Sequence, residues 1–198
     1  MNQQPTRDDE PAVLDLADGL HREAEQVLAD IRLSRILRPY GEVVPTGSYY
    51  LNVMVYPDID LYFPRVEVEK LFKIGGRFAS DERVVQVVFE QGDASMPGGL
   101  YLKLRIAIGE RQRLWKVDLW SLDQELIEQK MGVMRHFAAQ LTPALRLQIL
   151  RYKLSVMTPA GRTPMYSGYF IYKAFIDQGL TDFSAVTRYL QLNGIQIG

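Results

Sequence analysis

The sequence of 198 residues contains no cysteine and only two histidines, His21 and His136. The lack of cysteine excludes a disulfide scaffold, a cysteine-based zinc or iron–sulfur site and a cysteine nucleophile. Two histidines are too few for a histidine-rich zinc site or for a relay that uses several imidazoles. Any metal must therefore be held mainly by oxygen ligands, which favours a hard cation such as Mg²⁺.

Membrane and targeting signals are also missing. No apolar run reaches the ~18 to 20 residues that a membrane span needs, and residues 1–11 lack the basic start and apolar stretch of a signal peptide. We therefore expect a cytoplasmic protein with no membrane partner. The patterns G-x-x-x-x-G-K-[ST] and G-x-G-x-x-G are absent as well, which removes the two commonest glycine-rich nucleotide-binding loops.

Charge is unevenly distributed along the chain, although the formal net charge is only −1. Residues 1–129 contain 15 basic and 22 acidic residues, whereas residues 130–198 contain 8 basic and 2 acidic residues. No Asp or Glu occurs between Glu128 and Asp177. This asymmetry is either a chance feature of a solvated surface or a sign that an acidic part and a basic part share an anionic ligand.

The apolar patterns predict an α+β chain. Alternating or β-branched runs indicate strands at 42–46, 58–63, 84–89, 100–108 and 112–120. Helical spacing indicates helices at 11–37, 48–55, 66–79, 123–131, 143–157, 164–178 and 182–193. We expect a small mixed β-sheet with helices packed on it, followed by a C-terminal helical extension.

Three short stretches carry residues suited to chemistry. They are Gly47-Ser48 after a strand, Asp58 and Asp60 on the next strand, and Asp118 within an apolar strand. Asp58 and Asp60 point to the same face of their strand, where two carboxylates repel unless a cation lies between them. If the strand of Asp118 is a neighbour, three carboxylates converge and suit one or two Mg²⁺ ions with positions open to phosphate oxygens.

Gly47 and Ser48 supply a complementary function. A glycine lets the backbone approach a ligand closely, and backbone amides with a serine hydroxyl can hold a phosphate. A Gly-Ser pair alone is usually a turn, and an Asp-x-Asp alone is usually a solvated strand end. The three stretches in this order are much harder to explain as chance, and together they are what phosphoryl or nucleotidyl transfer needs.

Gly47-Ser48, a gap of nine residues, Asp58-Ile59-Asp60-Leu61 and the later Val117-Asp118-Leu119 resemble the signature of the DNA polymerase β-like nucleotidyltransferase superfamily. The compact build is similar to its small bacterial members. The resemblance implies a nucleotidyltransferase core with an N-terminal helix over residues 1–120, and a helical region packed on that core over residues 121–198. The apolar, aromatic segment 49–57 departs from the pattern of many relatives, which leaves the acceptor open.

The resemblance also implies roles for individual residues. Gly47 and Ser48 would bind the β- and γ-phosphates of an NTP, with ATP as the expected nucleotide. Asp58 and Asp60 would hold Mg²⁺, and Asp118 would complete a second metal site or act as the general base towards the acceptor hydroxyl. Helices after the core close over the triphosphate in this superfamily. The candidates there for phosphate or base contacts are Lys153, Tyr169 and Lys173, and each of them could equally be a packing or surface residue.

These observations predict an Mg²⁺-dependent enzyme of the EC 2.7.7 type. It would transfer NMP from an NTP to a hydroxyl of a small-molecule acceptor and release pyrophosphate. Two alternatives stay open: a toxin-type nucleotidyltransferase that modifies a protein or a tRNA, and a non-catalytic nucleotide-binding regulatory module. Retention of Asp118 argues for catalysis. The sequence does not determine the base, the acceptor or the oligomeric state.

Overall fold

The computed structural model of the protein describes residues 9–109 and 113–197. These residues form two compact units. One unit contains residues 22–50, 57–109 and 113–134 and carries the β-sheet, and the other contains residues 9–21, 51–56 and 135–197 and is helical. The domain division expected after residue 120 stays a prediction.

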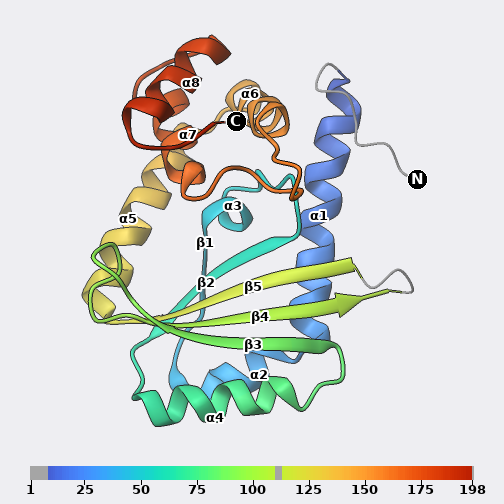
Figure 1. Cartoon of the computed structure of the whole chain (residues 1–198), viewed down its shortest axis with the longest axis vertical. Helices are drawn as coiled ribbons and strands as arrows, with labels where there is room; N and C mark the ends of the chain where they lie inside the picture. Colours follow the sequence, from blue (N-terminus) through green and yellow to red (C-terminus); the bar gives the residue numbers. More distant parts are fainter. Residues whose placement is uncertain (1–8, 110–112, 198) are drawn as a thin grey trace. The chain divides into compact units, whose positions relative to one another are not determined.

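A five-stranded mixed sheet forms the centre of the first unit (Figure 1). Its strands are β1 (Val44–Thr46), β2 (Asp58–Pro64), β3 (Val84–Gln91), β4 (Leu100–Ile108) and β5 (Arg113–Leu122), in the order β1-β2-β5-β4-β3. Strands β2 and β5 are parallel, and the other neighbours are antiparallel. The predicted mixed sheet is confirmed. Residue 112, where we expected the last strand to begin, lies outside the described residues.

One face of this sheet is apolar because alternate residues of each strand are aliphatic or aromatic. Helix α4 (Val68–Ala79) follows β2 and buries Leu71, Ile74 and Phe78. Its Gly75 allows a close approach to the sheet, since a Cβ there would lie 3.3 Å from Val87 and 3.4 Å from Leu102. The helix predicted at residues 66–79 therefore exists and covers strands β3 and β4.

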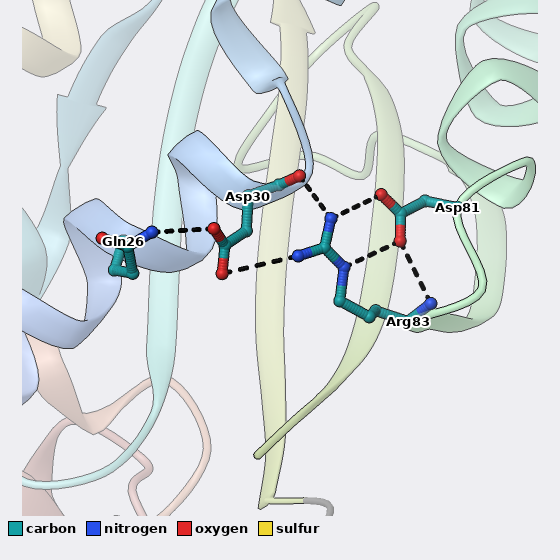
Figure 2. A network of polar contacts seen from close by, with 4 residues as sticks. All are labelled: Gln26, Asp30, Asp81 and Arg83. Carbon is teal, nitrogen blue, oxygen red and sulfur yellow. Dashed lines mark hydrogen bonds and ion pairs between the residues drawn. The ribbon is translucent and has the colours of Figure 1, made fainter.

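The long N-terminal helix expected at residues 11–37 is wrong as a single helix. Helix α1 (Glu10–Asp30) ends at Asp30, and Arg32 lies in the left-handed region with φ 54°. Helix α2 (Leu33–Leu37) and a 3-10 helix (Arg38–Tyr40) follow. Arg83 stabilises this break (Figure 2). Its guanidinium donates to the backbone carbonyl of Asp30 and to the Asp81 carboxylate, with 2.8 Å from Nη2 to Oδ2.

The helix predicted at residues 48–55 is also too long, because α3 covers only Gly47–Tyr50. Asn52 then has φ 51° and cannot continue a right-handed helix. Residues 51–56 belong to the helical unit. There the side-chain amide of Asn52 donates to Asp18 Oδ1 at 3.1 Å, and the backbone carbonyl of Asn52 accepts from Arg146 Nε at 2.8 Å.

Helices dominate the second unit. They are α6 (Pro143–Ser155), α7 (Ser167–Ile176) and α8 (Phe183–Leu192), together with the first part of α1 and the end of α5 (Gln124–Gln140). The Thr142 hydroxyl caps α6 by accepting from the Leu145 amide at 3.2 Å, as the Thr-Pro pair predicted. The Thr163-Pro164 pair does not begin a helix at residue 164 as predicted. Tyr166 has φ 60°, and the helix begins only at Ser167.

The core of the helical unit is rich in aromatic rings. Tyr152 packs edge-on against Phe175 and Phe183, with ring centroids 5.8 and 5.2 Å apart, and its hydroxyl lies 3.0 Å from that of Thr187. Such pairs bury a large apolar area and prefer this edge-to-face geometry.

Among the helices of residues 9–109 and 113–197, none is long and apolar enough to cross a membrane.

Candidate active site

Three carboxylates converge on one face of the sheet. Asp60 lies directly opposite Asp118 in the parallel pairing of β2 and β5, and Asp58 precedes Asp60 by two residues. One oxygen from each of the three carboxylates lies within 4.8 Å of the others. The carboxylates were expected to converge if their strands were neighbours, and β2 and β5 are neighbours.

Strand periodicity explains why these side chains share a face. Ile59 and Leu61 of β2 and Val117 and Leu119 of β5 are at most 1% exposed and point to the apolar face. The residues between them must then point to the opposite face. A slip of one residue in either strand would exchange the two sets and bury the carboxylates among aliphatic side chains, so the core fixes the register of the site.

Asp118 is the most buried of the three, with a side chain 10% exposed. Burial raises the pKa of its carboxyl group; the Lys116 ammonium opposes this shift and Asp58 reinforces it. The Tyr101 hydroxyl donates to Asp118 Oδ1 at 2.7 Å. Burial and the negative charge of Asp118 in turn raise the pKa of Tyr101. Asp118 is therefore held in place from two sides.

Lys116 places a positive charge among the carboxylates of the site. Its Nζ lies 2.7 Å from Asp118 Oδ2 and 3.1 Å from Asp58 Oδ1. Burial alone would lower the pKa of Lys116, but the carboxylates of Asp58 and Asp118 raise it. One ammonium thus compensates part of the charge of three carboxylates.

The site fits a divalent cation. Asp58 Oδ1 is buried and accepts no hydrogen bond within the described part of the chain, although it forms an ion pair with Lys116 Nζ at 3.1 Å. A buried charged oxygen without a donor is costly unless another positive partner satisfies it. Three carboxylates on one face are oxygen ligands of the kind that Mg²⁺ and Mn²⁺ prefer.

Gly47 brings the backbone against this cluster. It has φ +60°, and a Cβ at this position would lie 2.7 Å from Asp60 Oδ2. Only a residue without a Cβ therefore fits both the backbone conformation and the space. Ser48 follows Gly47 in α3 and is half-buried. Their predicted contact with phosphates stays a prediction.

The remaining sequence candidates lie in the helical unit. Lys153 is buried in α6, where its Nζ donates to the Val53 carbonyl at 2.6 Å and lies 5.9 Å from the Tyr56 ring centroid and 5.8 Å from that of Tyr172. Its charge is therefore already solvated by a carbonyl and two rings. This environment accounts for Lys153 without a ligand, and its nucleotide contact stays a prediction.

Tyr169 and Lys173 lie one turn apart on α7, as their spacing predicted. Tyr169 is 42% exposed, and the Lys173 Nζ lies 5.8 Å from its ring centroid. On its inner side the Tyr169 ring contacts Phe137, with centroids 6.0 Å apart. Both side chains remain candidates for nucleotide contacts.

Sequence reasoning missed Lys116 and Tyr101. Lys116 precedes Asp118 by two residues, so strand periodicity alone places it on the same face. The partnership of Tyr101 with Asp118 carried no such signal, because it depends on the pairing of β4 with β5.

Comparison with solved structures shows which fold this is. The chain is similar to Cid1 poly(U) polymerase with Mg and 3′-dATP bound, at 17% identity and a TM-score of 0.54, over 78% of this chain and 48% of that one. It is also similar to GLD-2 in its complex with RNP-8, at 13% identity and a TM-score of 0.56, over 87% of this chain and 62% of that one. The fold is the nucleotidyltransferase core.

The chain resembles known proteins in structure but not in sequence. A poly(A) polymerase complex of GLD-2 with GLD-3 is likewise similar, at 13% identity and a TM-score of 0.55, over 85% of this chain and 60% of that one. The chain spans about half to three-fifths of the length of these solved chains. No protein-family profile and no curated protein sequence matches this one.

Proposed function

We propose that this protein is a metal-dependent nucleotidyltransferase that transfers a nucleoside monophosphate from an NTP to an acceptor hydroxyl. The observation that carries the proposal is the convergence of Asp58, Asp60 and Asp118 within 4.8 Å on one sheet face. The acceptor oxygen attacks the α-phosphorus, the bond from this phosphorus to the oxygen shared with the β-phosphorus breaks, and pyrophosphate leaves. The hydroxyl proton passes to a base at the site or to water.

The residues divide this work by position. Asp58, Asp60 and Asp118 hold the metal, and Mg²⁺ is the ion that their oxygen ligands favour. A bound divalent ion supplies positive charge to the phosphate oxygens as negative charge builds up on them. Gly47 and Ser48 hold the β- and γ-phosphates, which the close approach of the Gly47 backbone to Asp60 supports.

Asp118 serves the acceptor side. The Tyr101 hydroxyl orients one of its oxygens, so the carboxylate presents a fixed geometry. It either completes the metal site or accepts the proton of the attacking hydroxyl. In both roles it must stay aligned with Asp60, and the register that pairs the two residues secures that alignment.

We assign a hydroxyl at the end of an RNA as the acceptor. Support comes from the similar structures, whose names are poly(U) polymerase and poly(A) polymerase. The small-molecule acceptor expected from the sequence finds no such support. A tRNA, one of the alternatives in the sequence analysis, belongs to the RNA class.

The test uses the purified full chain with Mg²⁺, each of the four α-labelled NTPs, and either a short single-stranded RNA or tRNA. We expect label on the RNA, release of pyrophosphate, and preference for one base. The double variant Asp58→Asn, Asp60→Asn should abolish transfer, whereas Asp123→Asn, at an exposed position after β5, should not. Full activity of the double variant would rule out this site.

The same assay distinguishes the other hypotheses. Pyrophosphate release that needs a small hydroxyl compound, with no label on RNA, would restore the small-molecule acceptor. NTP binding without pyrophosphate release under any condition would identify a nucleotide-binding regulatory module.

A further inference from the structure

Lys116 occupies a position that the backbone fixes. It is the direct partner of Asp58 in the parallel pairing of β2 and β5, and its own amide donates to the Pro57 carbonyl at 3.1 Å. It also precedes Asp118 by two residues on the same strand, so both point to the same face. The contacts of its ammonium with Asp58 and Asp118 therefore follow from the ladder and not from a chance rotamer.

The contacts of Lys116 matter because the site concentrates negative charge. Three carboxylates within 4.8 Å repel each other strongly, since the side chains of Asp58 and Asp118 are only 14% and 10% exposed and water screens them poorly. Lys116, itself 23% exposed, supplies one positive charge in their midst. A divalent ion bound by the same carboxylates would supply two, and its charge would repel the Lys116 ammonium, which contacts Asp58 and Asp118.

We propose that Lys116 is a built-in counter-cation, which keeps the three carboxylates assembled without metal and is displaced when a divalent ion binds. The inference rests on the proposed metal site. Lys116 is thus a positioning residue that lowers metal affinity, because each binding event must first break its contacts with Asp58 and Asp118. The benefit is that the ligands are already in place when the metal arrives.

Lys116→Met should therefore have two opposite effects. Without metal, the uncompensated carboxylates repel, so the melting temperature in EDTA should fall. With metal, no ammonium competes, so the Kd for Mn²⁺ should decrease about tenfold or more. Lys116→Arg keeps the charge and should bind Mn²⁺ no more tightly than the wild type.

Lys103 offers a matched control. It is the cross-strand partner of Asp118 on the other side of β5, and its side chain is 24% exposed, close to the 23% of Lys116. Its ammonium pairs instead with Glu90, at 4.0 Å. Lys103→Met should change the Kd for Mn²⁺ less than about twofold, since the ammonium that it removes pairs with Glu90 and not with the carboxylates of the site.

The experiment titrates the metal-free full chain with Mn²⁺ by calorimetry and by the loss of the free-ion electron paramagnetic resonance signal. A tighter Kd for Lys116→Met than for the wild type and Lys103→Met supports the proposal. An unchanged or weaker Kd overturns it while leaving the metal site itself in place. No metal binding by the wild type or by Lys116→Met overturns both this inference and the proposed function.

A second measurement uses the wild type and does not depend on how the variant folds. Lysine acetylation by a limiting reagent, read by mass spectrometry, should rise at Lys116 when Mn²⁺ is added, because the displaced ammonium loses its ion pairs. Acetylation at Lys103 serves as the internal reference. No rise at Lys116 under saturating Mn²⁺ would contradict displacement.

Discussion

Replacing Gly47 with alanine should affect metal binding much more than the stability of the fold. Its φ of +60° places it in the left-handed region, where an alanine costs about 1–2 kcal/mol. Replacing glycine also restricts the unfolded chain, which offsets about 0.4–1 kcal/mol of that cost. We therefore expect Gly47→Ala to lower the free energy of unfolding by only about 1 kcal/mol.

The effect of the same change on metal binding should be larger. The new Cβ would lie 2.7 Å from Asp60 Oδ2 and 3.4 Å from Asp60 Cγ. Because the oxygen is the end of a short side chain, the carboxylate can rotate away, which relieves the clash but displaces a metal ligand. Disturbing the support of a metal ligand weakens binding about 10–100-fold, and we expect a loss of that size for Mn²⁺.

Gly76→Ala is the control for this experiment. Gly76 lies within α4, and a Cβ there would meet nothing within 4 Å, so alanine should stabilise the protein by about 0.5–1 kcal/mol. Urea unfolding measures the stability of both variants, and calorimetric titration with Mn²⁺ measures their affinity. Wild-type Mn²⁺ affinity in Gly47→Ala would refute the argument that Gly47 is required for the position of Asp60.

Polar contacts of Asp81, Tyr101 and Ser121 should each contribute measurably to the free energy of unfolding. The Arg83 guanidinium lowers the pKa of Asp81 to about 2, so its ionised form stabilises the fold above the unfolded pKa near 4. Asp81→Asn should cost about 1 kcal/mol at pH 7 after allowance for solvent screening, and roughly half of that by pH 3, measured as the difference in urea midpoints. Tyr101→Phe removes the hydrogen bond to Asp118 and should lower stability by about 1.5–3 kcal/mol, the range for a bond to a charged group. Ser121→Ala removes a fully buried hydroxyl that bonds a backbone amide at 2.8 Å and a carbonyl at 3.1 Å; the expected cost is about 1–3 kcal/mol by urea unfolding, and an unchanged midpoint would contradict it.

Strand elements with one apolar face were predictable from the sequence. The alternation of residues 100–108 predicted β4 with the bounds that the structure shows, because every second residue from Leu100 to Ile108 is aliphatic. The position of the carboxylates opposite the apolar face was predictable for the same reason, whereas their convergence also required β2 and β5 to be neighbours. Once the apolar residues of β2 and β5 face the core, the Asp residues between them must share the other face.

Helix limits were less predictable because they depend on distant partners. The bend at Arg32 is stabilised by Arg83, which lies far along the chain and satisfies the Asp30 carbonyl. Helix α5 was predicted to end at residue 131, before Gly132, yet it continues to Gln140. A glycine costs only about 1 kcal/mol within a helix, and the apolar positions Met134 and Phe137, which are buried in α5, outweigh that cost.

Lys116 and Lys103 together show what face patterns alone cannot decide. Lys116 lies on the strand of Asp118 and Lys103 lies opposite Asp118 on the neighbouring strand β4. Both share the face of the carboxylates, so alternation alone predicts either lysine as their partner. The two lysines have different partners because their neighbouring strands differ. Asp58 of β2 lies opposite Lys116, whereas Glu90 of β3 forms an ion pair with Lys103. Two half-buried lysines of similar exposure therefore have different partners because of strand order. The charge balance of the candidate metal site is thus a property of the sheet topology, and a comparison of the two lysine variants tests it directly.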